Sequence, residues 1–177
     1  MSLLINSQGA MFLSDTFVTE DPTAEEISEM AILAAEEIRR FGIEPKIALL
    51  SLSNFGSRDT ASSRKMREAL HLIWERHPEL EADGEMHGDS ALSLDLRERV
   101  MPDSRLKGEA NLLLFPNLDA ANIAHNLLKV ATRALHVGPI LLGAAKPAHI
   151  LTPSVTSRGV VNMSALASVE AQTRSAG

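Results

Sequence analysis

Two polar loops carry the side chains of this sequence that are best suited to bind a ligand. The first is the string Ser53-Asn54-Phe55-Gly56-Ser57. The second spans residues 146–158 and contains Lys146, His149, Thr152 and Ser154. Hydroxyls, amides and a cation near a helix start are groups that bind phosphate. We predict anion binding at Ser53, Asn54 and Ser57 and at the four named residues of the second loop. An ordinary turn and a helix-capping loop stay open as alternatives.

The first loop follows an apolar run, as phosphate-binding loops do, but it is not a P-loop. A P-loop ends in Gly-Lys-Ser/Thr, and that ending is missing here. Arg58 directly follows the loop and would add positive charge to an anion site.

A second constellation alternates along residues 83–89: Asp83, Glu85, His87 and Asp89. On a strand these side chains would share one face, and carboxylate with imidazole can hold a divalent metal. Gly84 and Gly88 weaken that strand, and no second histidine lies nearby. We therefore favour a polar edge or interface here and predict no metal site. The six histidines are scattered, so spacing alone identifies no catalytic set.

Composition excludes several classes of function. The 177 residues include no cysteine, which rules out disulfides, thiolate metal sites and a cysteine nucleophile. The formal net charge is −6 and aromatic residues make up 3%, which argues against nucleic-acid binding. No apolar stretch is long enough to span a bilayer, and no signal peptide is recognisable. We expect a cytoplasmic location.

The loops need a scaffold, and hydrophobic periodicity predicts its first part. Two short apolar runs around Ser7-Gln8-Gly9 indicate a hairpin. A helix should begin after Thr23, which can form a capping box with Glu26, and should end near Gly42. A second helix is expected over residues 62–76, a weak strand over 80–86 and a short helix over 91–100.

Three continuous apolar runs predict strands that are buried on both faces: residues 47–51, 111–115 and 137–142. Asn117 is expected to cap a long helix that reaches about residue 135, and a last helix should span residues 157–174. The alternation of strands and helices indicates an α/β fold with a mostly parallel sheet flanked by helices. Ligands of such sheets gather beyond the carboxyl ends of the strands, here at loops 52–59, 116–119 and 143–157.

Five strings together resemble the C-terminal half of phosphate acetyltransferases, in the right order along nearly the whole chain. They lie within residues 15–26, 47–57, 83–92, 108–123 and 138–147. The resemblance implies a fold like that of isocitrate and isopropylmalate dehydrogenases. It implies that residues 1–147 form the second domain of such an enzyme. Residues 148–177 would be the loop and last helix of a first domain that is otherwise absent.

That family converts acetyl-CoA and phosphate into CoA and acetyl phosphate, and its active members carry a Ser-Arg pair after the Lys-Pro step, with an aspartate six residues after the arginine. Here Thr152 stands at the serine position, Pro153 at the arginine position and Gly159 at the aspartate position. Proline has no donor with which to clamp a phosphate. The resemblance therefore implies that acetyl transfer is lost, and we assign no catalytic residue. An active phosphate acetyltransferase is the alternative.

The strings around Ser53 and His149 are most similar to the phosphotransacetylase-like domain of hybrid NADP-dependent malic enzymes. That resemblance implies a regulatory and oligomerisation domain with acetyl-CoA or CoA as its effector. NADP and a divalent metal would bind the absent malic domain, which carries out the oxidative decarboxylation of malate to pyruvate. We expect a homodimer or a higher homo-oligomer, with neither nucleic acid nor membrane as a partner.

Overall fold

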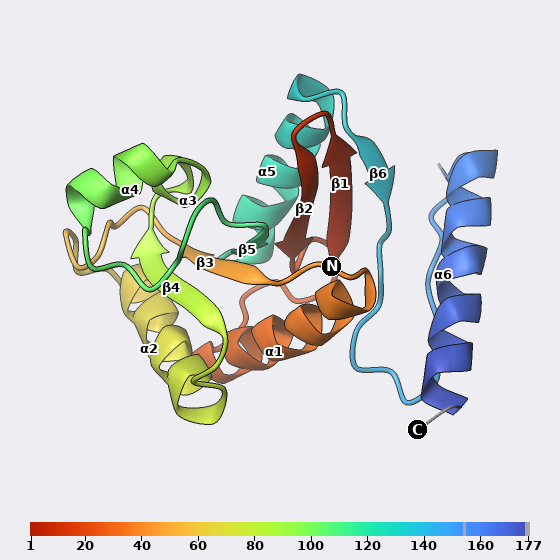
Figure 1. Ribbon diagram of the computed structural model, residues 1–177, viewed down its shortest axis with the longest axis horizontal. Helices are drawn as coiled ribbons and strands as arrows, with labels where there is room; N and C mark the ends of the chain where they lie inside the picture. The colour runs from red at the N-terminus through yellow and green to blue at the C-terminus, as the bar shows by residue number, and fades with distance from the viewer. Residues whose placement is uncertain (154, 176–177) are drawn as a thin grey trace.

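The fold is built around a mixed six-stranded sheet with helices on both faces, as seen in a computed structural model that describes residues 1–153 and 155–175 (Figure 1). The strands are β1 (Ser2–Asn6), β2 (Gly9–Ser14), β3 (Lys46–Leu50), β4 (Glu81–Met86), β5 (Leu112–Leu114) and β6 (Leu135–Val137). The helices are α1 (Ala24–Arg40), α2 (Ala61–Arg76), α3 (Gly88–Leu92), α4 (Leu94–Val100), α5 (Leu118–Ala131) and α6 (Ser157–Ser175). The predicted α/β class is confirmed.

The order of the strands across the sheet is β4-β3-β5-β2-β1-β6. Strands β2, β5, β3 and β4 pair in parallel, whereas β1 pairs antiparallel with both β2 and β6. It follows that β6 runs in the same direction as β2. The carboxyl ends of these strands, β1 excepted, therefore lie along one edge of the sheet.

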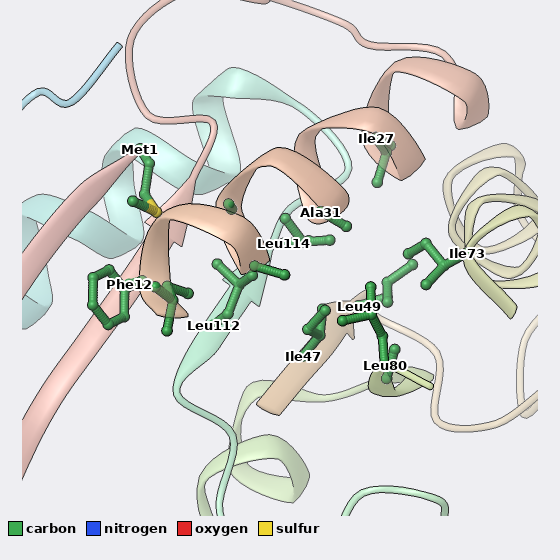
Figure 2. Close-up of a cluster of buried hydrophobic side chains, with 14 of the residues drawn as sticks. Met1, Phe12, Ile27, Ala31, Ile47, Leu49, Ile73, Leu80, Leu112 and Leu114 are labelled. Carbon is green, nitrogen blue, oxygen red and sulfur yellow. The ribbon is translucent and has the colours of Figure 1, made fainter. Parts of the chain in front are cut away.

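Alternate residues of the central strands enter two separate cores, because successive side chains of a strand point to opposite faces. On one face, Phe12, Ile47, Leu49 and Leu112 pack with α1 and α2, and Figure 2 shows this cluster. On the other face, Leu13, Ala48, Leu50 and Leu113 pack with residues of α3 and α5. Burial on both sides explains why strands 47–50 and 112–114 read as unbroken apolar runs.

Helix capping is as predicted for α1 and α5. The Thr23 hydroxyl accepts from the amide of Glu26, and the Glu26 carboxylate accepts from the amide of Thr23. The Asn117 side chain accepts from the amide of Ala120 at 2.9 Å. These bonds satisfy amides that have no partner within the helix.

Three predicted elements differ in the structure. The expected helix over 91–100 is two helices, because Ser93 is extended and caps α4. Helix α5 ends at Ala131 rather than near residue 135. It cannot continue because Arg133 adopts a positive φ of 51°, which lies outside the right-handed helical region. The prediction of a strand over residues 137–142 is wrong. Only residues 135–137 form β6, and it pairs antiparallel with β1 at an edge of the sheet. Pro139 has no amide hydrogen for a ladder.

Candidate functional site

The first polar loop, between β3 and α2, has already used its backbone donors. The amides of Ser53, Asn54 and Arg58 donate to serine hydroxyls within residues 51–57. The amide of Phe55 donates to the carbonyl of Glu85, and that of Gly56 donates to the Glu85 carboxylate at 2.9 Å. A protein carboxylate thus occupies the position that an anionic ligand would need.

Glu85 is fully buried, and Arg67 from α2 completes its environment with a 2.9 Å ion pair to the same oxygen, Oε1. Asn54 points away from this pair: its amide group donates to the Ser90 hydroxyl and its oxygen accepts from the amide of His87. Of the predicted anion-binding residues in this loop, Ser53, Asn54 and Ser57 do lie together. Their contacts, however, hold the ends of β3 and β4 in place.

The residues of the proposed metal alternative do not converge. Asp83 accepts from the Ser104 hydroxyl and from the amide of Arg105, whereas Glu85 faces Arg67. The register of β4 shifts here, since Gly84 pairs with Leu49 but Met86 pairs with Leu50. This irregularity breaks the two-residue period on which a shared face depends. Among the described residues, no group of three or more His, Asp or Glu side chains could hold a metal ion.

The second polar loop, residues 143–157, places its predicted site residues in different surroundings. Lys146 is exposed, whereas the side chain of His149 is only 4% exposed, and its Nδ1 accepts from the amide of Leu141 at 3.3 Å. Burial lowers the pKa of His149. Thr152 lies half-buried at the wall of two cavities. Ser154 lies outside the described residues.

The order of the strands separates the two polar loops. Strands β5, β2 and β1 lie between β3 and β6, which puts four inter-strand steps, about 19 Å, between the strands that lead into the loops. The sequence could not order the strands, because strand order depends on which strands hydrogen-bond edge to edge, often between segments far apart in the chain. The loops share an edge of the sheet, but they lie too far apart to bind the same phosphate.

A hollow beside the second polar loop was not foreseen from the sequence. It has a volume of about 360 Å³ and lies where the chain leaves β2 and where residues 139–152 pass α1. Its walls are largely apolar, with contributions from Phe17, Met30, Leu33, Leu141 and Ile150, and Thr152 supplies a hydroxyl. Asp15 closes one side, where its carboxylate accepts from the amides of residues 17–19. This cavity can hold an apolar chain.

A second cavity, of about 440 Å³, adjoins the first and shares Phe17, Pro139 and Thr152 with it. Its remaining walls come from α5, β6 and the start of α6. They are more polar and include His125 and His136, which spacing in the sequence did not single out. Only their scattered positions were visible in the sequence, and the fold brings them into contact.

The positions that the resemblance linked to acetyl transfer border these cavities. Pro153 is exposed and follows Thr152. Gly159, in the first turn of α6, lines the second cavity, and a Cβ there would lie 2.8 Å from Cγ2 of Val155. An aspartate at residue 159 would therefore force Val155 to move.

Helix α6 is held by charged groups as well as by its apolar residues. Met163 is buried in the α1 face of the core. Glu170 lies 3.4 Å from His149 and shares a hydrogen bond with Glu37 of α1. Burial, then the charge of Glu170, raises the pKa of Glu37. No helix in the described part of the chain is both long and apolar enough to cross a membrane.

Curated relatives of this sequence fall into two groups. The chain is 66% identical over 170 residues to the NAD-dependent malic enzyme of Rhizobium meliloti, covering 96% of this chain and 22% of that protein. It is 56% identical over 175 residues to the NADP-dependent malic enzyme of Escherichia coli, covering 98% of this chain and 23% of that protein. It is 34% identical over 166 residues to the phosphate acetyltransferase of Clostridium acetobutylicum, covering 93% of this chain and 50% of that protein.

Solved structures agree with the second group. A phosphotransacetylase from Streptococcus pyogenes superposes with a TM-score of 0.92 at 31% identity, covering 97% of this chain and 53% of that one. The EutD phosphotransacetylase from Staphylococcus aureus superposes with a TM-score of 0.90 at 29% identity, covering 96% of this chain and 53% of that one. The chain thus spans less than a quarter of these two malic enzymes and about half of the Clostridium acetyltransferase. The sequence profile described as phosphate acetyl/butaryl transferase matches residues 1–168, and the chain belongs to that family.

Proposed function

We propose that this chain is the regulatory and assembly region of a malic enzyme, in which acetyl-CoA binds as an inhibitor and acetyl transfer has been lost. In that enzyme, the malic domain with its nicotinamide coenzyme and divalent metal would precede residue 1. Residues 1–147 would be the second phosphotransacetylase-like domain, and residues 148–177 would belong mainly to the first. The malic enzymes among the relatives, at 53–66% identity, support this parentage.

One observation carries the loss of acetyl transfer: Pro153 stands where the resemblance expects an arginine. A guanidinium can clamp a phosphate with two parallel hydrogen bonds, and proline offers none. Gly159 removes the expected carboxylate as well, and Val155 fills the space that a side chain there would need. What remains is a cleft that can accommodate an acyl-CoA without the groups to transfer its acetyl unit.

The cavities support acetyl-CoA as the ligand. The apolar hollow of about 360 Å³ suits the acetyl and pantetheine part of the molecule. Thr152 offers a hydroxyl at the junction of the two cavities, and exposed Lys146 offers a cation for a phosphate. Ser53, Asn54 and Ser57 lie about four strands away, so in this proposal they can contact only a distant end of an extended ligand.

The test is inhibition of malate oxidation by acetyl-CoA in the intact parent enzyme. Lys146→Ala should remove a charge-assisted contact of about 1.5–3 kcal/mol, so that half-inhibition needs at least about tenfold more acetyl-CoA. Lys107→Ala is the matched control, since Lys107 is also an exposed lysine but lies beside β4 at the far edge of the sheet. Equal inhibition curves for the parent enzyme and Lys146→Ala would reject this placement of the ligand.

An active phosphate acetyltransferase is the second candidate, and the identity of 34–38% to enzymes of that name favours it. The Thr152 hydroxyl stands at the serine position and could still donate a hydrogen bond. Formation of acetyl-CoA from acetyl phosphate and CoA separates the two candidates. Our proposal expects no measurable turnover in the intact parent, and robust turnover would overturn the loss of acetyl transfer.

A further inference from the structure

Helix α6 is held to the rest of the molecule by few side chains. Figure 1 shows it at the side of the molecule, joined to β6 by a long segment without helix or strand. Of its described side chains, only those of Met163 and Glu170 are buried. Met163 packs in the apolar core, and Leu166 adds a partly buried contact there. Because a helix in a protein is stabilised mainly by its packed face, the position of α6 depends strongly on the polar contact of Glu170.

Glu170 belongs to a buried group of three titratable side chains, which we call the His149 cluster: Glu37 of α1, His149 of the second polar loop and Glu170 of α6. All three side chains are at most 5% exposed. Nδ1 of His149 accepts from the amide of Leu141, so the neutral imidazole carries its hydrogen on Nε2. That nitrogen faces Oε1 of Glu170 at 3.4 Å. The cluster thus joins three elements that are distant in the sequence.

The two carboxyl groups of the cluster need a proton between them. Arg40 donates to Oε2 of Glu37 at 2.7 Å, but no amide, hydroxyl or basic group of the described residues donates to Oε1. Glu37 and Glu170 share a hydrogen bond, which two carboxyl groups can form only when one of them is protonated. Burial, then the charge of Glu170, raises the pKa of Glu37, in agreement with a shared proton. Loss of this proton would leave two buried negative charges in contact.

The surroundings let the proton exchange but supply little charge to replace it. A cavity of about 210 Å³ borders the cluster, and exposed Glu36 and Arg40 of α1 line it beside Glu37 and Glu170, so the cavity opens to solvent. Burial lowers the pKa of His149, against the charge of Glu37 and together with that of the amino terminus. The imidazole is therefore neutral at alkaline pH, where it cannot balance a second carboxylate.

We propose that the proton shared by Glu37 and Glu170 holds α6 and the second polar loop against α1, and that its loss at alkaline pH releases both. Docking raises the pKa of Glu37, so the docked form is favoured at low pH and is lost as the pH rises through that raised value. The same loop carries Lys146 and Thr152, so release should also weaken inhibition by acetyl-CoA. This last consequence, unlike the release itself, rests on the proposed function.

Hydrogen exchange followed by mass spectrometry on the intact parent enzyme measures the docking of α6 without acetyl-CoA. Peptides within residues 157–173 would be compared with peptides of α2, with exposure times scaled for the pH dependence of intrinsic exchange. Glu37→Gln cannot titrate, and its amide can donate to Glu170 as protonated Glu37 does. His149 titrates in both proteins, so its contribution cancels when the two pH profiles are compared.

Between about pH 5 and about pH 9, protection of α6 in the parent should fall at least about tenfold relative to Glu37→Gln, since each unit by which docking raises a pKa is a factor of ten in the docking equilibrium. Glu36→Gln is the matched control, because Glu36 is exposed beside the same cavity, and it should follow the parent. Parallel profiles for the parent and Glu37→Gln would overturn the proposal. If α2 also loses protection in that variant, Glu170→Gln provides the same comparison.

Inhibition of malate oxidation by acetyl-CoA, measured over the same pH range, tests the consequence for the ligand. We expect half-inhibition of the parent to need more acetyl-CoA at alkaline pH, and that of Glu37→Gln to change less. Release of α6 without any change in inhibition would leave the role of the shared proton standing and would count against acetyl-CoA binding at this loop.

Discussion

Nε2 of His149 lies 3.4 Å from Oε1 of Glu170, which joins the second polar loop to the last helix. Both side chains are almost fully buried, and Glu37 of α1 lies beside Glu170. His149, which the sequence predicted as a ligand contact, thus helps to hold α6 against α1. A cluster of two carboxylates and one imidazole in this position makes the docking of α6 sensitive to pH.

The direction in which stability changes with pH follows from the pKa of Glu37. Its pKa is raised, so the unfolded chain releases this proton at a lower pH than the folded chain does. The stability contributed by the protonated form is therefore lost as the pH rises from about 4.5 through the raised pKa. Glu170→Gln removes the charge that helps to raise the pKa of Glu37. The free energy of unfolding of this variant should therefore fall less over this pH range than that of the unaltered chain. Urea unfolding at a series of pH values, with exposed Glu68→Gln as the control, checks this, and parallel curves would contradict it.

His125 has the opposite dependence. Its folded pKa of about 4 lies below the unfolded value of about 6.5, so between these limits only the unfolded chain takes up the proton. Stability should fall by about 3 kcal/mol as the pH drops through this window. His125→Phe cannot titrate, and the difference between the two unfolding curves isolates the effect. A constant difference from about pH 7 to pH 4 would show that His125 titrates normally.

The buried carboxylate of Glu85 should contribute more to stability than the exposed carboxylate of Asp59, which pairs with the same arginine. Glu85→Gln leaves the amide of Gly56 with an acceptor but deprives half-buried Arg67 of a charged partner. We expect a loss of about 1–3 kcal/mol in the free energy of unfolding. Asp59→Asn is the matched control because Asp59 pairs with the same Arg67 while being exposed. Its loss should stay within about 1 kcal/mol, and equal losses would refute the structural role of Glu85.

Assembly should depend on the outer face of α5. Ile123, Leu127 and Val130 are 60%, 66% and 73% exposed at helical spacing, whereas Ala121 is buried and Leu128 packs toward the core. We propose that this stripe forms a twofold homodimer. Leu127→Lys should yield a monomer in light scattering, while Val161→Lys on the exposed face of α6 should leave the dimer intact. A monomeric parent chain at high micromolar concentration would disprove the dimer.

The sequence by itself determined the elements whose signals are local. The capping box of Thr23 and Glu26, the Asn117 cap and a helix over residues 62–76 were predicted because they depend on neighbours within a few residues. The α/β class followed in the same way from unbroken apolar strands, and the family followed from strings spread along the chain. Each of these features is written into short stretches of residues.

Tertiary structure decided which distant residues meet. Strand order placed the two polar loops far apart, and the antiparallel pairing of β6 with β1 replaced a parallel strand. Residues at positions 125 and 136 came into contact across α5 and β6, and residues 149 and 170 across a loop and a helix. No local pattern encodes these pairs, because they arise when the apolar faces of separate elements pack and bury whichever side chains lie between them.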